Sequence, residues 1–193
     1  MTAPKLSNIT YNLAIEEVRQ RLKRAGMDPI DPGLAAHLIN VAITNLANRV
    51  IDTDLYLVEQ TMTVPTTSKV QVSGSVVAIL KDGFDYEVSG VTSVADENNP
   101  SGIAIVSRRA LDALLQNSLT ADVPYAAYFS GKLEVHYPAV DDLPTQLDVV
   151  YLRNPALADA SLNLIGDSVT IDAPASQYPA LIADVLQMLG ATK

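Results

Sequence analysis

The sequence predicts an α+β fold, namely a small helical bundle with an inserted antiparallel β-rich domain. The bundle is expected to consist of an N-terminal helix pair plus middle and C-terminal helices. Apolar residues recur at helical spacing near both ends of the chain and around residues 107–117, and at a period of two in much of the region between. Helices therefore come first and last, and one helix interrupts the strands. This order is typical of α+β folds rather than of βαβ repeats.

Composition permits a packed core and removes several kinds of chemistry. Of 193 residues, 48% are hydrophobic and 18% are charged, which argues against wholesale disorder. The absence of cysteine excludes disulfides, thiolate metal sites, iron–sulfur clusters and cysteine nucleophiles. The two histidines, His37 and His136, are far apart in the sequence, which argues against a multi-histidine metal site. We therefore expect no metal and no cofactor.

The net charge of -9 makes the chain a poor candidate for wrapping nucleic acid, which is bound mainly by cationic surfaces. Residues 1–50 hold six basic and four acidic side chains, whereas the remainder holds seven and eighteen. The longest uncharged apolar stretch, residues 33–48, is too short to span a bilayer. No targeting segment is visible, so we expect a soluble intracellular product that does not bind membranes.

Two helices are expected in residues 8–51. The first begins at a cap at Ser7 or Asn8 and ends at Gly26, where glycine accepts a left-handed conformation. The second runs from Pro32 to about Ile51 after an Asp31 cap and is apolar on more than one side. Such a helix is expected to be buried between layers or subunits, with His37 in the core or an interface.

A basic cluster lies in the last turns of the first helix. Its members are Arg19, Arg21, Lys23 and Arg24. Cations there suit the helix dipole, so a capped, solvated helix end explains the cluster. The alternative is a docking surface for an acidic partner.

Short strand-like segments with β-branched or alternating apolar residues fill most of the region from Asp54 onward. Lys81-Asp-Gly83 is expected to form a hairpin turn between two of them. Ser107 is expected to cap a helix, and a C-terminal helix is expected over 176–189. We therefore divide the chain into an N-terminal helix pair (1–53), a β-rich region with one helix near 107–117 (54–172), and a C-terminal helix that packs back on the pair (173–193). The expected strands are 55–64, 70–72, 76–80, 84–88, 91–95, 103–106, 132–137, 146–153 and 168–171.

Residues that carry catalysis are sparse. There is no glycine-rich phosphate loop and no Gly-x-Ser-x-Gly elbow. Glu134 and His136 share one strand face and could form an acid/base pair, or His136 is a plain exposed histidine. Three carboxylate pairs, 52/54, 96/97 and 141/142, lie in turns or at element ends, where solvated turn chemistry is expected.

An aromatic cluster, Tyr125, Tyr128 and Phe129, precedes Gly131. Aromatic side chains can stack on bases or sugars. Because no lysine or arginine is interleaved, we expect these side chains to pack onto the sheet or onto a neighbour instead.

The ordered set of local patterns resembles the head–tail adaptor proteins of tailed bacteriophages, also called connector or neck ring proteins. The patterns that carry the resemblance are the helical pair at 8–51, Ile79-Leu-Lys-Asp-Gly-Phe-Asp-Tyr86, the helix at 108–116, Tyr125-Ala-Ala-Tyr-Phe-Ser-Gly131 running into Lys132-Leu-Glu-Val-His-Tyr-Pro138, Val149-Val-Tyr-Leu-Arg-Asn-Pro155, and Gln177-Tyr-Pro-Ala-Leu-Ile182. They extend over nearly the whole chain.

The resemblance implies a non-enzymatic structural virion protein at the head–tail junction (the neck), present in the host cytoplasm during assembly. Its partners would be further copies of itself in a ring, usually of twelve, the portal protein, and a tail or further neck protein. Genomic DNA would pass through the ring without sequence-specific binding. The interface candidates are Arg19, Arg21, Lys23, Arg24, Tyr125, Tyr128, Phe129 and Tyr178.

Two alternatives stay open. A soluble ligand- or carbohydrate-binding β-module would use the aromatic stretch 125–129. An enzyme that uses carboxylates alone, such as a glycoside hydrolase with two acids, would use Glu134. The short chain without tryptophan offers little platform for a sugar.

Overall fold

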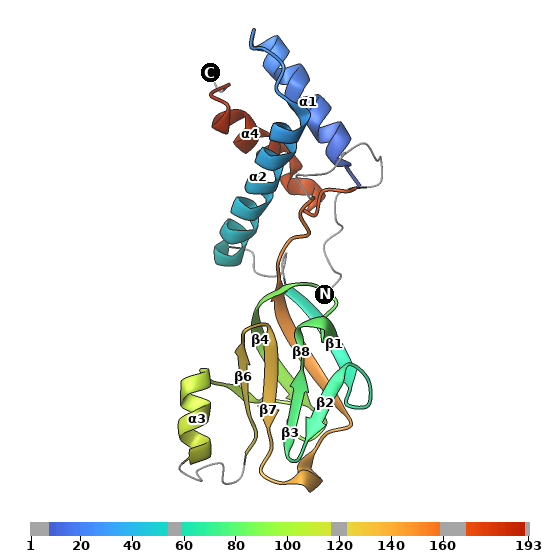
Figure 1. The fold of residues 1–193 in the computed structure, drawn as a ribbon, viewed down its shortest axis with the longest axis vertical. Helices are drawn as coiled ribbons and strands as arrows, with labels where there is room; N and C mark the ends of the chain where they lie inside the picture. The colour runs from blue at the N-terminus through green and yellow to red at the C-terminus, as the bar shows by residue number, and fades with distance from the viewer. Residues whose placement is uncertain (1–7, 54–58, 117–122, 159–168, 192–193) are drawn as a thin grey trace. The chain divides into compact units, whose positions relative to one another are not determined.

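The computed structural model describes residues 8–53, 59–116, 123–158 and 169–191 (Figure 1). In this part of the chain it has four α-helices and two β-sheets, which confirms a mixed α+β fold. The chain divides into two compact units. Residues 1–58 and 155–193 form the helical unit, and residues 59–154 form the β unit.

The helical unit is built from both ends of the chain. Its helices are α1 (Tyr11–Arg24), α2 (Pro32–Thr53) and α4 (Tyr178–Met188), and each contacts the other two. A short 3-10 turn, η4 (Ala175–Gln177), leads into α4. The two chain stretches are also joined by a β-bridge between Thr10 and Thr170. Ser168, at the start of the expected strand 168–171, lies outside the described residues, and Thr170 contributes only this bridge.

Helix α1 is amphipathic. Its buried face is made of Tyr11, Ala14, Ile15, Val18 and Leu22. Thr10 caps the helix by accepting a hydrogen bond from the Leu13 N–H (3.3 Å), so the expectation of a cap at Ser7 or Asn8 is wrong. Threonine at this position supplies the same hydroxyl acceptor that serine would. Gly26 lies at φ +74°, which confirms the left-handed stop.

Helix α2 is buried along one stripe rather than on all sides. Asp31 caps it by accepting from the N–H groups of Gly33 and Leu34 (2.9 and 3.1 Å). His37 is exposed, so its expected place in the core is wrong. The stripe is made of small and branched side chains, namely Ala35, Ala36, Ile39, Ala42, Ile43 and Leu46. The apolar side chains outside this stripe, Leu34, Leu38 and Val41, are exposed or half-buried.

The β unit holds the two sheets. One has the order β1-β8-β4, all antiparallel, and the other has the order β2-β3-β7-β6-β5. The β5–β6 pair is parallel, so the expectation of a purely antiparallel region is wrong. The strands are β1 (Glu59–Pro65), β2 (Val70–Ser73), β3 (Val76–Ile79), β4 (Val88–Asp96), β5 (Ala104–Ile105), β6 (Tyr125–Phe129), β7 (Lys132–His136) and β8 (Gln146–Arg153).

The two sheets share one core. Buried side chains from β1, β4 and β8 pack with those from β3, β6 and β7, and Phe84 and Ile103 from the connections join them. Phe84 meets the Tyr151 ring edge-on, with ring centroids 5.3 Å apart. Alternation along β8 places Leu147, Val149 and Tyr151 in this core, which is the pattern of a strand with one face buried.

The segment 81–88 differs from the expectation. Lys81–Gly83 is a 3-10 turn, η2, between β3 and β4, which lie in different sheets, so it is not a hairpin turn. Residues 84–87 form no strand. A Cβ built at Gly83 would lie 2.8 Å from the Lys69 carbonyl oxygen. The glycine therefore serves a close approach of two backbone segments.

Helix α3 (Arg108–Gln116) belongs to the β unit, where it contacts β6 and its Leu111 is fully buried, so its expected place in the helical bundle is wrong. The Ser107 hydroxyl accepts from the Ala110 N–H (3.2 Å), which confirms the expected cap. A second 3-10 turn, η3 (Val140–Asp142), lies between β7 and β8. Among the residues that the structure describes, no helix is both long and apolar enough to cross a bilayer.

Candidate functional site

The basic cluster of α1 separates into two parts. Arg19, Lys23 and Arg24 line a groove of about 780 Å³ between the second half of α1 and the turn that follows it, which contributes Met27 and Asp28. We call this feature the basic groove. Lys23 and Arg24 are exposed, and Arg19 is partly exposed. The lining also includes the carboxylates Glu16 and Asp28, so the groove has three basic and two acidic side chains and keeps an excess of positive charge.

Arg21 has a different role. Its guanidinium lies 2.6 Å from the Glu17 carboxylate, and the Tyr178 hydroxyl donates to the same carboxylate (2.8 Å). Burial and the hydrogen bond to Glu17 raise the pKa of Tyr178 well above its usual range. Of the interface candidates, Tyr178 thus joins α4 to α1 through Glu17, and Arg21 pairs with the same carboxylate within α1.

The aromatic residues of β6 lie on two faces of the sheet. Tyr128 faces the shared core, where its hydroxyl donates to the Val88 carbonyl (2.8 Å) and its ring meets Phe84 edge-on. Tyr125 and Phe129 follow the opposite alternation, and the Arg108 guanidinium covers the Phe129 ring at 4.6 Å from the centroid. The three rings therefore do not form one stacking platform, which a sugar- or base-binding surface would need.

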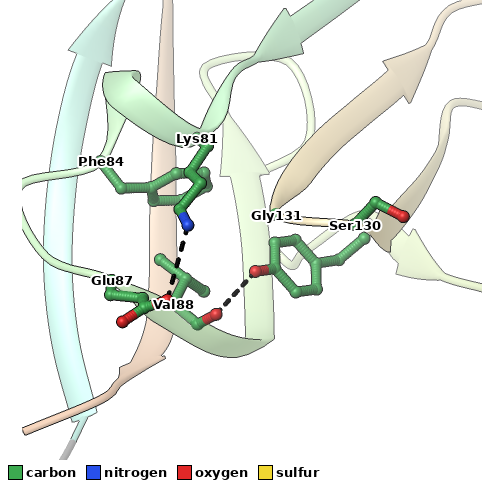
Figure 2. A pocket seen from close by; sticks show the side chains of 7 residues that line it. Lys81, Phe84, Glu87, Val88, Ser130 and Gly131 are labelled. Carbon is green, nitrogen blue, oxygen red and sulfur yellow. Dashed lines mark hydrogen bonds and ion pairs between the residues drawn. The ribbon is translucent and has the colours of Figure 1, made fainter.

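A small pocket, shown in Figure 2, is lined in part by Tyr128. Its volume is about 150 Å³, and its lining includes Lys81, Glu87 and Ser130. The Lys81 ammonium lies 3.5 Å from the Glu87 carboxylate, as the dashed line in Figure 2 marks. This pocket is smaller than the roughly 300 Å³ at which cofactor and small-molecule sites begin. It suits water or a small ion better than a sugar.

Glu134 is the centre of a charged cluster on the sheet face that carries Phe129. Its carboxylate lies 2.6 Å from Arg108, 2.5 Å from Lys132 and 3.4 Å from the His136 imidazole. Arg108 also pairs with Asp112 on the next turn of α3 (3.0 Å). We call these five residues the Glu134 cluster.

The Glu134 cluster brings together Glu134 and His136, so the expectation of an exposed strand histidine is wrong, because His136 is half-buried beside the carboxylate. Lys132 and Arg108 share the same carboxylate. Burial alone would raise the pKa of Glu134, yet the hydrogen bonds from Lys132 and His136 and the charges of Lys132 and Arg108 bring the pKa below its ordinary value. A carboxylate held ionised in this way is a weak proton acceptor. The arrangement fixes α3 to the sheet rather than preparing an acid/base step. Sequence reasoning missed Arg108, which is 26 residues away from Glu134.

Asp96 is a second site that sequence reasoning missed. It was expected to be a solvated turn residue, but it is only 3% exposed. One carboxylate oxygen accepts from the N–H groups of Asn98 and Asn99 (2.8 and 2.6 Å), and the other accepts from the Tyr137 hydroxyl (2.7 Å). Asp96 is therefore not a solvated turn residue, and these three hydrogen bonds satisfy its buried carboxylate.

No grouping of three or more His, Cys, Asp or Glu side chains suited to a metal ion occurs within the described ranges. The expected pair 52/54 has Asp54 outside the described residues. A comparison with known protein families finds no family model that matches the chain, and a comparison with curated proteins finds no match.

Proposed function

We propose that the protein is a structural virion protein, a head–tail adaptor that forms a ring between portal and tail and provides a conduit for DNA. In this proposal the helical unit is a small bundle, and the β-rich domain is an insertion that the bundle carries. The protein works by adhesion and symmetry matching at the neck of the virion and carries out no catalytic step. It enters the particle from the host cytoplasm during assembly.

One observation carries this proposal, namely the way in which the two units share the chain. Helices α1, α2 and α4 contact one another although α4 is more than 120 residues away from α2 in the sequence. The whole β unit, residues 59–154, lies between them in the chain. A helical body closed by both chain ends, with a β-rich insertion, is the architecture that the resemblance to adaptor proteins implies.

Charge supports the same proposal. The β unit holds twelve acidic and six basic side chains, and such an excess of carboxylates does not retain DNA. A conduit for DNA needs this property, and we propose that the acidic excess of residues 51–193 lines or rims the channel. The basic groove supplies a cationic surface for a protein partner, either a neighbouring copy or the portal.

Mass photometry of the purified protein, alone and mixed with tail-less particles, tests the proposal. We expect stoichiometric binding to particles that carry a portal, or a free species near twelve times 20.6 kDa. Heads assembled without a portal are the matched control and should bind nothing. A monomer that ignores portal-bearing particles contradicts the proposal.

A further inference from the structure

Three cations of the basic groove lack a strong partner in the described part of the chain. The Arg19 Nε is buried without a hydrogen-bond partner there, and its guanidinium reaches Glu16 only at 3.8 Å. Lys23 and Arg24 make no ion pair among the described residues, in contrast to Arg21, which is 2.6 Å from Glu17. Lys23 and Arg24 are exposed, so they can receive carboxylates from outside their own unit, whereas the Arg19 Nε is buried and cannot.

The β unit presents an anionic surface of matching kind. Glu97, Asp141 and Asp142 are exposed and make no ion pair among the described residues. They lie on two connections, the loop after β4 and the turn η3, which Glu97 links by accepting from the Thr145 N–H and hydroxyl (2.5 and 2.9 Å). We call these three residues the acidic edge.

The acidic edge is preorganised. Asp96 fixes the loop after β4 through its bonds to Asn98, Asn99 and Tyr137. Asp142 accepts from the Ala139 N–H (3.1 Å) and so closes η3. Because little side-chain freedom remains to be lost at Glu97 and Asp142, docking of this surface costs less entropy than docking of a free loop.

We propose that the basic groove of one copy binds the acidic edge of a second copy of this chain. Opposite charges that one chain carries on two separate units favour contact between unlike surfaces of two copies. Contacts of this heterologous kind build rings when the rotation closes. The inference deepens and rests on the proposed function, because it names the partner of the α1 surface in the ring. The net charge of -9 argues against nucleic acid as the occupant.

Sedimentation velocity with charge-swap variants tests this contact. The groove variant is Arg24→Glu and the edge variant is Asp141→Lys, both at exposed positions. Arg109→Glu and Asp82→Lys are the matched controls, since they change the charge equally at exposed positions outside both surfaces. Circular dichroism verifies that all four variants fold.

The wild type should associate with increasing concentration up to about 200 µM, a range that populates contacts of micromolar affinity. Each swap variant alone should associate at least about tenfold more weakly, because like charges then face each other. An equimolar mixture of the two swap variants should recover association, since each altered surface meets its complement. The controls should behave as the wild type, and added salt should weaken association.

Several results would overturn the inference. They are a wild type that stays monomeric throughout, swap variants that associate as well as the controls, and a mixture without recovery. An effect of the swaps that does not depend on concentration would place the contact within one chain and would also overturn it. Binding to portal-bearing particles distinguishes a failure of this inference from a failure of the proposed function. If the protein binds these particles but the charge swaps do not change its self-association, only the contact is rejected. If the swaps weaken self-association but the protein does not bind the particles, only the adaptor role is rejected.

Discussion

Removing one hydroxyl from Tyr137 should destabilise the β unit by about 2 kcal/mol. The Tyr137 hydroxyl donates to Asp96 at 2.7 Å, and the two residues are 4% and 3% exposed. A hydrogen bond to a charged group contributes about 1.5–3 kcal/mol, and the Tyr137→Phe change leaves one buried carboxylate oxygen unpaired. The change removes no ring atom, so a packing defect adds little to the loss.

Tyr128→Phe is the matched control. Its hydroxyl also donates within the β unit, but to the uncharged Val88 carbonyl at 2.8 Å, so the expected loss is about 1 kcal/mol. Urea unfolding followed by near-ultraviolet circular dichroism measures both variants, because the chain has eight tyrosines and no tryptophan. An equal or smaller loss for Tyr137→Phe than for Tyr128→Phe would refute the reasoning.

The same pair predicts a dependence on alkaline pH. Burial, followed by the hydrogen bond and charge of Asp96, raises the pKa of Tyr137 far above its ordinary value. A tyrosine whose pKa is higher in the folded state stabilises the fold below the unfolded pKa of about 10 and loses that contribution as the pH rises. The free energy of unfolding of the wild type should therefore fall more steeply above about pH 10 than that of Tyr137→Phe.

Three further changes test other parts of the account. Gly83→Ala should cost about 1–3 kcal/mol in urea unfolding, because the new Cβ would lie 2.8 Å from the Lys69 carbonyl and 2.9 Å from an Ile79 methyl carbon. Gly90→Ala, whose Cβ would lie 4.0 Å from Leu152, should be nearly neutral, and equal costs would contradict the close approach at Gly83. Asp31→Ala should cost the helical unit about 1 kcal/mol through loss of the α2 cap, as measured by thermal unfolding, whereas Asp31→Asn should keep most of the stability. Because the pKa of Glu134 is lowered in the folded state, the free energy of unfolding of the wild type should fall as the pH drops below about 4.5. Glu134→Gln should reduce this fall. If the free energy of unfolding depends on acid pH in the same way in both proteins, the stabilising role of the Glu134 cluster is contradicted.

The sequence predicted those helix ends and strands that depend on a single residue or on the spacing of neighbouring apolar residues. Strand β8 occupies residues 146–153 as expected, because its alternation is strict and one face is buried. The Ser107 cap, the Asp31 cap and the left-handed Gly26 follow from the side chain or backbone freedom of a single residue. The mixed α+β class follows from the same periodicities.

The features that were missed depend on pairing between distant residues. Nothing in Lys81-Asp-Gly83 indicates that the flanking strands belong to different sheets, since the sequence of a turn does not report which strands pair. Asp96 lies in a polar stretch typical of an exposed loop, and its burial depends on Tyr137, 41 residues later. The Glu134 cluster likewise needs Arg108 from α3. The local signal of this burial is spacing: Asp96 follows Val94 by two residues in β4, which places both side chains on the same, buried face of the strand.

The copy number of the protein on tail-less particles tests the adaptor role most directly. Labelled protein is added in excess to portal-bearing heads, the particles are isolated by sedimentation, and the bound copies per particle are counted. We expect saturation at one fixed number for every particle, about a dozen, and no binding to heads assembled without a portal. Absence of binding, or equal binding to both kinds of head, would contradict it.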